Sequence, residues 1–303
     1  MKYTKHLLLR EYLFILFLLS ITVFITSYEL KVLQNGLYLK KAVTKEIDYE
    51  AFRNLKLGED TLNKAELQAN RLRREFPDLR NNTYVNMTGC LTYSMMLSYL
   101  DLKDTGLLED KMVKKGISNM AKTKQFQKLY GYYYEILNDL KYFPVPRVLD
   151  NHVDISYVDS WYQPRTYGGD RKHEGTDLMA SNNKRGFFPV LSITDGTVEK
   201  MGWLEQGGYR IGIRAPSGGY FYYAHLASYA QELKEGDTVI AGQLLGFMGD
   251  SGYGKEGTTG QFAVHLHLGI YVNLDHEEMS VDPYPILKFL EKNRTVYNHQ
   301  KNN

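Results

Sequence analysis

The chain has 303 residues, of which 43% are hydrophobic and 24% are charged, a balance that excludes a disordered chain and a polytopic membrane protein. Its formal net charge of +2 is too small to favour a nucleic acid as the partner. Cys90 is the only cysteine, so an intrachain disulfide is impossible and a metal site would have to use other residue types.

The first predicted element is a charge-free stretch at residues 12–28, which follows Lys2, Lys5 and Arg10. As a helix it would extend about 26 Å, slightly less than the roughly 30 Å hydrocarbon core of a bilayer. The basic flank predicts a cytoplasmic N-terminus, an uncleaved single-pass transmembrane anchor within residues 1–29, and an extracytoplasmic remainder at the cell membrane. A cleaved signal peptide is the alternative, although no Ala-x-Ala site follows the apolar run.

Residues 30–83 are charged and only weakly periodic, which predicts a helical or partly flexible stalk. Residues 84–148 contain helix-length segments, and apolar residues between Phe126 and Leu140 recur at helical spacing, so we expect an α-helical region there. Two prolines, at 144 and 146, would break any helix and mark a boundary. The role of the helical region is open, since it could dock a protein partner, cover a groove or act only as a spacer.

Beyond this boundary, short β-prone runs alternate with turn signals: FFPVLSI, GTVEKMGW, YRIGIRA, GYFYYAHL, DTVIAGQLLGFMG and FAVHLHLGIYV. Their spacing is typical of a mainly β domain with an antiparallel sheet, which we place at residues 151–290. Residues 291–303 would then be a polar tail.

Histidines and one carboxylate gather in this β-rich half. In FAVHLHLGIYV, His265 and His267 alternate with an apolar set that includes Phe262, so a strand would place both imidazoles on one face and Phe262 in the core. His173 and Asp177 are four residues apart, a spacing that lets an imidazole and a carboxylate turn to one cation across a short loop.

Two further residues, Gly175 and His225, bear on the interpretation of these candidate site motifs. Gly175, between His173 and Asp177, disfavours the helix that an H-E-x-x-H motif requires. His225 in GYFYYAHL shares a predicted strand face with Phe221 and Tyr223. Each motif is weak alone, because a half-buried histidine bonded to a carbonyl or a solvated aspartate is the plainer interpretation.

Taken in order, the motifs resemble peptidase family M23, the lysostaphin and LytM type of peptidoglycan endopeptidase. The resemblance covers residues 161–290 and rests on H-x-x-x-D at 173–177, D-G-x-V at 195–198, H-L at 225–226, G-D-x-V-x-x-G-Q at 236–243, G-D-S-G at 249–252 and H-L-H at 265–267. It implies an M23-like fold with zinc ligands His173, Asp177 and His267 and catalytic histidines His265 and His225. Tyr167 would correspond to a site tyrosine of some relatives.

The function implied is a membrane-anchored zinc metalloendopeptidase that hydrolyses peptide bonds in the stem peptide or cross-bridge of bacterial peptidoglycan. Three protein ligands leave a fourth position on Zn²⁺ for a water that the metal activates. Because no H-E-x-x-H glutamate is present, we expect His265 to act as the base. His225 would stabilise the oxyanion or share the proton.

Two alternatives use the same residues differently. A non-catalytic M23-type module would bind and regulate another cell-wall hydrolase, but it has no physical need for five metal-site residues. A sugar-phosphotransfer carrier of related β-architecture would use a phosphorylated histidine in the cytoplasm. The predicted outward orientation and the H-x-x-x-D motif disfavour that carrier.

Overall fold

The structure, a computed structural model, describes residues 12–27, 46–149, 152–166 and 169–298. The chain divides into two compact units, residues 1–46 and 47–303. In the first unit, residues 12–27 form a helix with exposed apolar side chains. Within the described ranges, no helix combines the length and the apolar character needed to cross a membrane. The predicted anchor also includes flanking residues that lie outside the described ones.

Four helices form the helical layer of the second unit: α3 (Thr61–Glu75), α4 (Met87–Leu97), α5 (Asp110–Met120) and α6 (Lys124–Leu137). Helix α4 is central, since it is buried on nearly every side and packs against α3, α5 and α6. Side chains cap two helix starts: Asn86 accepts from the amide of Gly89, and Thr123 accepts from that of Phe126. On α6 the predicted apolar stripe is buried, so the helical region is confirmed.

The described part of the predicted stalk packs into this unit. Helix α3 packs against α4, and Phe52 of the short helix α2 (Tyr49–Arg53) lies with its ring 4.9 Å from that of Tyr133 on α6. We therefore correct the stalk prediction for residues 46–83. The buried face of α3 includes Ala65 and Gln68, and such small and polar residues weaken the apolar periodicity that would reveal a packed helix.

The rest of the unit is built on a ten-stranded sheet whose described pairings are all antiparallel. The strand order is β12-β9-β10-β11-β14-β7-β4, while β13 joins β11 to β8 and β15 pairs with β14. The strands are β4 (Ile155–Ser156), β7 (Thr176–Ala180), β8 (Pro189–Leu191), β9 (Gly196–Leu204), β10 (Gly208–Arg214), β11 (Tyr220–Tyr229), β12 (Thr238–Val239), β13 (Leu244–Met248), β14 (His265–Leu274) and β15 (Glu277–Val281). Every predicted β-prone run contains at least one of them, which confirms the mainly β, antiparallel fold.

Shorter elements complete the unit. They are the pairs β1 (Lys56–Leu57) with β2 (Asp101–Leu102), β3 (Arg147–Val148) with β16 (Val296–Tyr297) and β5 (Pro164–Arg165) with β6 (Arg171–Lys172), the helix α7 (Tyr284–Leu290) and the 3-10 turns Pro77–Leu79 and Glu291–Asn293. The predicted polar tail is thereby corrected up to residue 298, because β16 pairs back onto β3 and Arg294 donates to the carbonyl of Val145 at 2.8 Å. Residues 299–303 lie outside the described ones.

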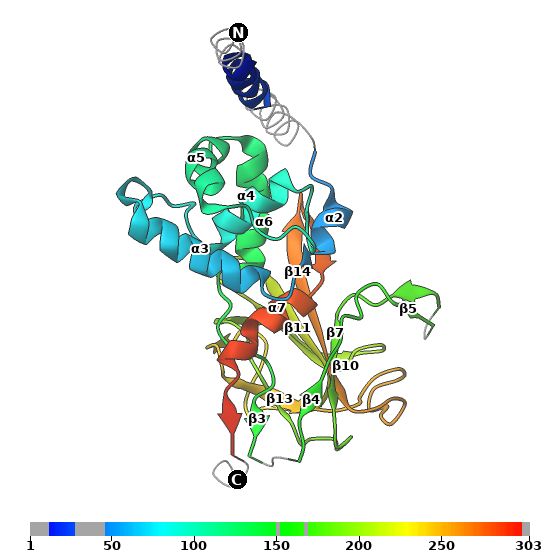
Figure 1. Cartoon of the computed structure of the whole chain (residues 1–303). Coiled ribbons are helices and arrows are strands. Elements are labelled where there is room, and N and C mark those ends of the chain that lie inside the picture. The colour runs from blue at the N-terminus through cyan, green and yellow to red at the C-terminus, as the bar shows by residue number, and fades with distance from the viewer. Residues whose placement is uncertain (1–11, 28–45, 150–151, 167–168, 299–303) are drawn as a thin grey trace, which may run out of the picture. The chain divides into compact units, whose positions relative to one another are not determined.

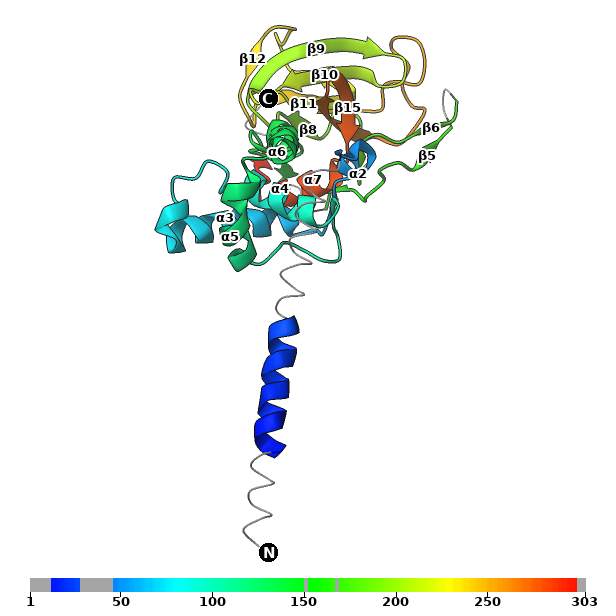
Figure 2. The ribbon, with the colours of Figure 1, turned by 90° about the horizontal axis from the view of Figure 1, so that it is seen from above.

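Strand β14 connects the sheet to the helical layer. Figures 1 and 2 both place α6 between the other helices and the sheet, and α6 contacts β14. Glu135 of α6 accepts from the amide of Asn273 at 3.1 Å, and Lys128 binds Asp275, just beyond the strand, at 2.6 Å. Residues 47–303 consequently form one compact unit, which the boundary predicted after the two prolines does not divide.

Asp282, between β15 and α7, has a buried carboxyl that accepts from the amide of Tyr284 at 2.9 Å. Burial raises its pKa from an ordinary 3.8 to about 8. As the pH rises, the unfolded chain loses this proton first, while the folded protein retains it. The contribution of this group to stability is therefore fully present below about pH 4 and is lost as the pH rises through about 8.

We expect Asp282→Asn, which keeps the acceptor for the Tyr284 amide, to be more stable than the wild type at about pH 9. The gain should be on the order of a few kcal/mol, since the variant has no buried carboxyl to ionise, and it should vanish at about pH 4. Urea unfolding at the two pH values measures it, with the exposed Asp170→Asn as the control. An equal gain at both pH values would contradict the raised pKa.

Candidate metal centre and active site

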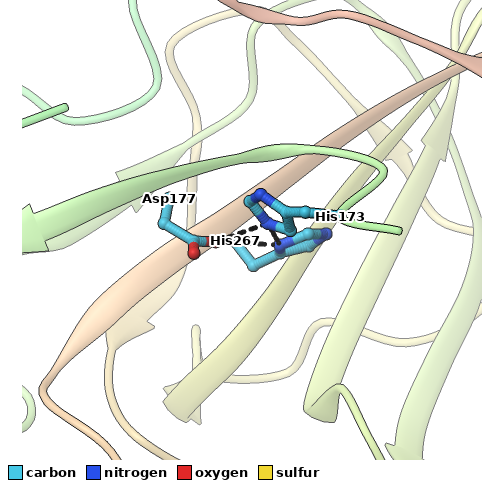
Figure 3. A group of neighbouring side chains, drawn as sticks. All are labelled: His173, Asp177 and His267. Atoms are coloured by element: carbon cyan, nitrogen blue, oxygen red, sulfur yellow. Dashed lines mark hydrogen bonds and ion pairs between the residues drawn. The ribbon is translucent and has the colours of Figure 1, made fainter. Parts of the chain in front are cut away.

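Two neighbouring strands place two of the predicted ligands side by side. In the ladder between β7 and β14, Asp177 stands opposite His267. Residues directly opposite each other in an antiparallel pair have Cβ atoms about 4.5–5.5 Å apart and point to the same face. Figure 3 shows both side chains turned toward each other, together with His173. Asp177, which the sequence placed across a short loop, thus belongs to a strand.

His173 reaches the same point from the turn between β6 and β7. Its Nε2 lies 3.1 Å from Oδ1 of Asp177 and 3.1 Å from Nδ1 of His267, and those two partner atoms are 3.0 Å apart. Its Nδ1 lies 3.1 Å from the carbonyl oxygen of Ser160. Because a carbonyl only accepts, Nδ1 carries the proton and Nε2 turns its lone pair to the other two residues. We call His173, Asp177 and His267 the triad.

The protonation of the triad suits a cation. Burial alone would raise the pKa of Asp177, but the neighbouring imidazoles of His173 and His267 outweigh it and hold that pKa well below its usual range. Burial lowers the pKa of His267, against the attraction of the Asp177 carboxylate. At neutral pH an ionised carboxylate therefore faces a neutral imidazole, the forms in which these side chains bind metal ions.

An arginine binds the second oxygen of Asp177. Nη2 of Arg165, in β5, donates to Oδ2 of Asp177 at 2.6 Å, which leaves Oδ1 turned toward the two imidazoles. Such a bond fixes the rotation of a ligating carboxylate. Arg165 could not be predicted from the sequence, because it belongs to no motif and has no characteristic spacing from its partner.

His265 and His225 lie beside the triad with their ring centroids 4.7 Å apart. Nδ1 of His265 donates to the carbonyl of Ala263 at 2.7 Å, and Nδ1 of His225 donates to that of Ser251 at 2.8 Å. In the neutral rings Nε2 therefore has no proton and can accept one. Burial lowers the pKa of both histidines, which keeps them neutral at pH 7. All five predicted site residues thus converge.

His225 lies on a different face from the one predicted. Phe221 and Tyr223 are buried in the core, whereas His225 lines the cavity. Its φ of 62° is left-handed, and β11 changes register with β10 and β13 nearby. A single residue in this conformation interrupts the alternation of a strand and turns the imidazole toward the site.

A cavity of about 680 Å³ lies over the five residues. The residues that line it include Arg171, Lys172, Leu204 and Tyr222. Phe262, predicted to point into the core, also lines it, with its ring 4.6 Å from that of His225. The prediction fails because β14 begins only at His265, so the alternation does not extend back to residue 262.

Gly175 makes room for the triad. A Cβ at this position would overlap the imidazole of His267 and approach the carbonyl of Leu268. The sequence identified this glycine only as a helix breaker, whereas its packing role depends on a residue 92 positions later, in another strand. Tyr167, the other site residue that the resemblance suggested, lies outside the described residues.

The chain was compared with known families and curated proteins. Residues 171–283 match the family described as Peptidase family M23. The chain is 42% identical over 177 residues to the L-Ala–D-Glu endopeptidase of Bacillus subtilis strain 168, an alignment that covers 58% of this chain and 51% of that protein. It is 36% identical over 118 residues to lysostaphin of Staphylococcus simulans, covering 38% and 21%. The chain thus spans about half the length of the first relative and a fifth of the second.

Among solved structures, the chain is similar to a candidate glycyl-glycine endopeptidase LytM from Ruminococcus gnavus ATCC 29149, with a TM-score of 0.68 and 42% sequence identity. This similarity covers 86% of the chain and 98% of that protein, so it extends well beyond the residues that match the family. Because a relative of this identity is covered over almost its whole length, the motifs, the fold and the comparisons agree that the chain belongs to peptidase family M23.

Proposed function

We propose that this protein is a zinc-dependent endopeptidase that hydrolyses a peptide bond in bacterial peptidoglycan. The proposal is carried by the convergence of the triad's three donor atoms, 3.0–3.1 Å apart, beside an open cavity that also holds two neutral histidines. The names of two relatives, an L-Ala–D-Glu endopeptidase and lysostaphin, support the class of substrate.

The donor set fits zinc. Imidazole nitrogen and carboxylate oxygen are its usual ligands in catalytic sites, where three protein ligands leave one position open. Tetrahedral bonds of about 2.0–2.2 Å would separate ligand atoms by roughly 3.3–3.6 Å, a few tenths of an ångström more than the observed 3.0–3.1 Å. Held there by His173, Asp177 and His267, zinc would polarise the scissile carbonyl and lower the pKa of water.

The protein's own histidines would move the proton. When the water oxygen attacks the carbonyl carbon, one proton must leave it, and the breaking C–N bond requires a proton on the departing nitrogen. Nε2 of His265 is an acceptor, because Nδ1 is committed to Ala263, so it can take the first proton and supply the second. His225 has the same tautomer, which favours sharing of the proton. It could donate to an oxyanion only after gaining one.

The non-catalytic binding module has no specific support. Binding alone does not require these two buried histidines. The Nδ1 atom of each donates to a backbone carbonyl, so the Nε2 atom of each can accept a proton. Zinc content measured together with release of muropeptides separates the two functions, since a binding module would release none.

Two substitutions separate the ligand role from the base role. We expect His267→Ala to lose most of its zinc, because removing one of three protein ligands weakens the site. His265→Ala should keep its zinc and fold, while kcat falls by roughly 10² or more, and adding His225→Ala should not multiply the loss. Metal analysis and mass spectrometry of muropeptides measure both, with the exposed His276→Ala as the control. Near-normal turnover by zinc-loaded His265→Ala would contradict the mechanism.

The charge of the cavity favours a substrate with a carboxylate near the scissile bond. The two carboxylates that line the cavity, Glu174 and Asp177, are each already paired with an arginine. Arg171 and Lys172 line it as well, and their charges would add to that of bound zinc. A glycine bridge has no side-chain charge, whereas a D-glutamyl residue has a free carboxylate. We therefore propose cleavage next to an acidic residue of the stem peptide.

An L-Ala–D-Glu peptide and the same peptide with that carboxylate converted to an amide differ by one charge. We expect kcat/KM to be at least about 10-fold lower for the amide, since a hydrogen bond to a charged group contributes about 1.5–3 kcal/mol. Arg171→Gln should slow cleavage of the acidic peptide only, and Lys111→Gln, exposed on α5, should change neither rate. Equal cleavage of both peptides would contradict the charge preference alone, and cleavage of neither would contradict the peptidase itself.

For the first unit we propose a membrane anchor that leaves the peptidase unit outside the cytoplasm. The charge-free run at residues 12–28 and the preceding basic residues support it. Within the helix at residues 12–27, the hydroxyls of Ser20, Thr22 and Thr26 donate to carbonyls of the same helix, so they present no unsatisfied donor to lipid.

Protease added to intact protoplasts should then degrade the peptidase unit, because the anchor would expose it on the outer side. Immunoblotting with an antibody against the β-rich part measures the loss. A cytoplasmic protein probed in the same sample must survive as the control. Survival of the peptidase unit until the membrane is opened would place it inside and contradict the topology.

A further inference from the structure

One short segment brackets the triad residue His173. The carbonyl of Ser160 accepts from its Nδ1, the carbonyl of Gln163 accepts from its amide at 2.9 Å, and its own carbonyl accepts from the amide of Tyr162 at 2.8 Å. Tyr162 has a φ of 58°, a left-handed conformation that a tyrosine adopts only when its surroundings hold it. The orientation of this imidazole therefore depends on what holds residues 160–163.

Helix α2, more than 100 residues earlier in the chain, holds that segment. Nε1 of Trp161 donates to Oδ1 of Asn54 at 2.9 Å, and the hydroxyl of Tyr162 donates to Oε2 of Glu50 at 3.1 Å. The guanidinium carbon of Arg53 lies 5.9 Å and 5.5 Å from the ring centroids of Trp161 and Tyr162. These separations are within the range of cation–π attraction.

Arg53 also binds the residue next to His173. Its Nη2 donates to Oε1 of Glu174 at 3.0 Å and to Oγ of Ser280 at 2.9 Å, while its Nε donates to the carbonyl of Ser280 at 2.8 Å. Oγ of Ser280 in turn donates to Oε2 of Glu174 at 2.6 Å. Arg53 is only 6% exposed, and charge-assisted hydrogen bonds away from water hold their partners in a fixed geometry.

We propose that Arg53 is a positioning residue for the zinc ligand His173, so that helix α2 helps to orient one ligand of the metal centre. Arg53 touches no triad atom and acts through Glu174 and residues 160–163. The inference rests on the zinc site proposed above, but Arg53 and residues 160–163 themselves lie before residue 171, where the family match begins. Removing a group that orients a metal-binding histidine typically weakens metal affinity about 10–100-fold.

Arg53→Met in the full chain tests this, because methionine keeps an unbranched apolar stem and removes every guanidinium hydrogen bond. Competition of the metal-free protein with a chromophoric chelator gives the zinc Kd, and circular dichroism confirms the fold. We expect Kd to weaken about 10–100-fold. Lys56→Met, which removes an exposed cation paired with Asp101, should bind zinc as the wild type does. Wild-type affinity in a folded Arg53→Met protein would overturn the proposal.

Trp161→Phe decides the question if Arg53→Met does not fold. It keeps an aromatic ring beside Arg53 and deletes the hydrogen bond to Asn54, which is worth about 2–10-fold in an equilibrium constant. We expect Kd to weaken by that factor and the absorption spectrum of the Co²⁺-loaded protein, which reports ligand geometry, to change. Unchanged affinity and spectrum would overturn the proposal. Failure of the zinc site itself would differ, since the wild type would then bind no zinc.

Discussion

The pairing of β7 with β14 sets Asp177 opposite His267, and the other parts of the proposed centre are arranged around that register. A slip of one residue would turn either side chain away from the cavity, because successive residues of a strand face opposite sides of the sheet. Leu178, Leu266 and Leu268 resist the slip, since they belong to the same two strands and are fully buried. The apolar core therefore holds the polar site in place.

Around this register, the two carboxylates that line the cavity are paired with protein side chains. Asp177 commits Oδ2 to Arg165 and keeps Oδ1 for the triad, and Glu174 commits both oxygens to Arg53 and Ser280. Pairing offsets the cost of removing these carboxylates from water. It also leaves His173 and its partners in the arrangement that a cation needs, so that binding would require little reorganisation.

Local patterns were sufficient to predict most strands, because apolar alternation is a property of short stretches, while the family resemblance named the three residues that the structure brings together. The same reasoning misplaced His225, where one left-handed residue interrupts the alternation, and Phe262, where the ladder has not yet begun. Arg53 and Arg165 carry no pattern at all, since tertiary packing rather than spacing selects their partners. The packing of helix α3 was missed for a related reason, because its buried face is partly small and polar.

Strand β14 has a second use at the end away from the cavity. Asn273, near the end of that strand, is bound by Glu135 of α6, and the adjoining Asp275 is bound by Lys128 of the same helix. His265, His267 and the residues that contact the helical layer thus belong to one strand. A chimeric cell-wall hydrolase that contained only residues 171–283 would lack helix α6. The surface of β14 that α6 covers would then be exposed to solvent. The piece that recombination could move intact is residues 47–298.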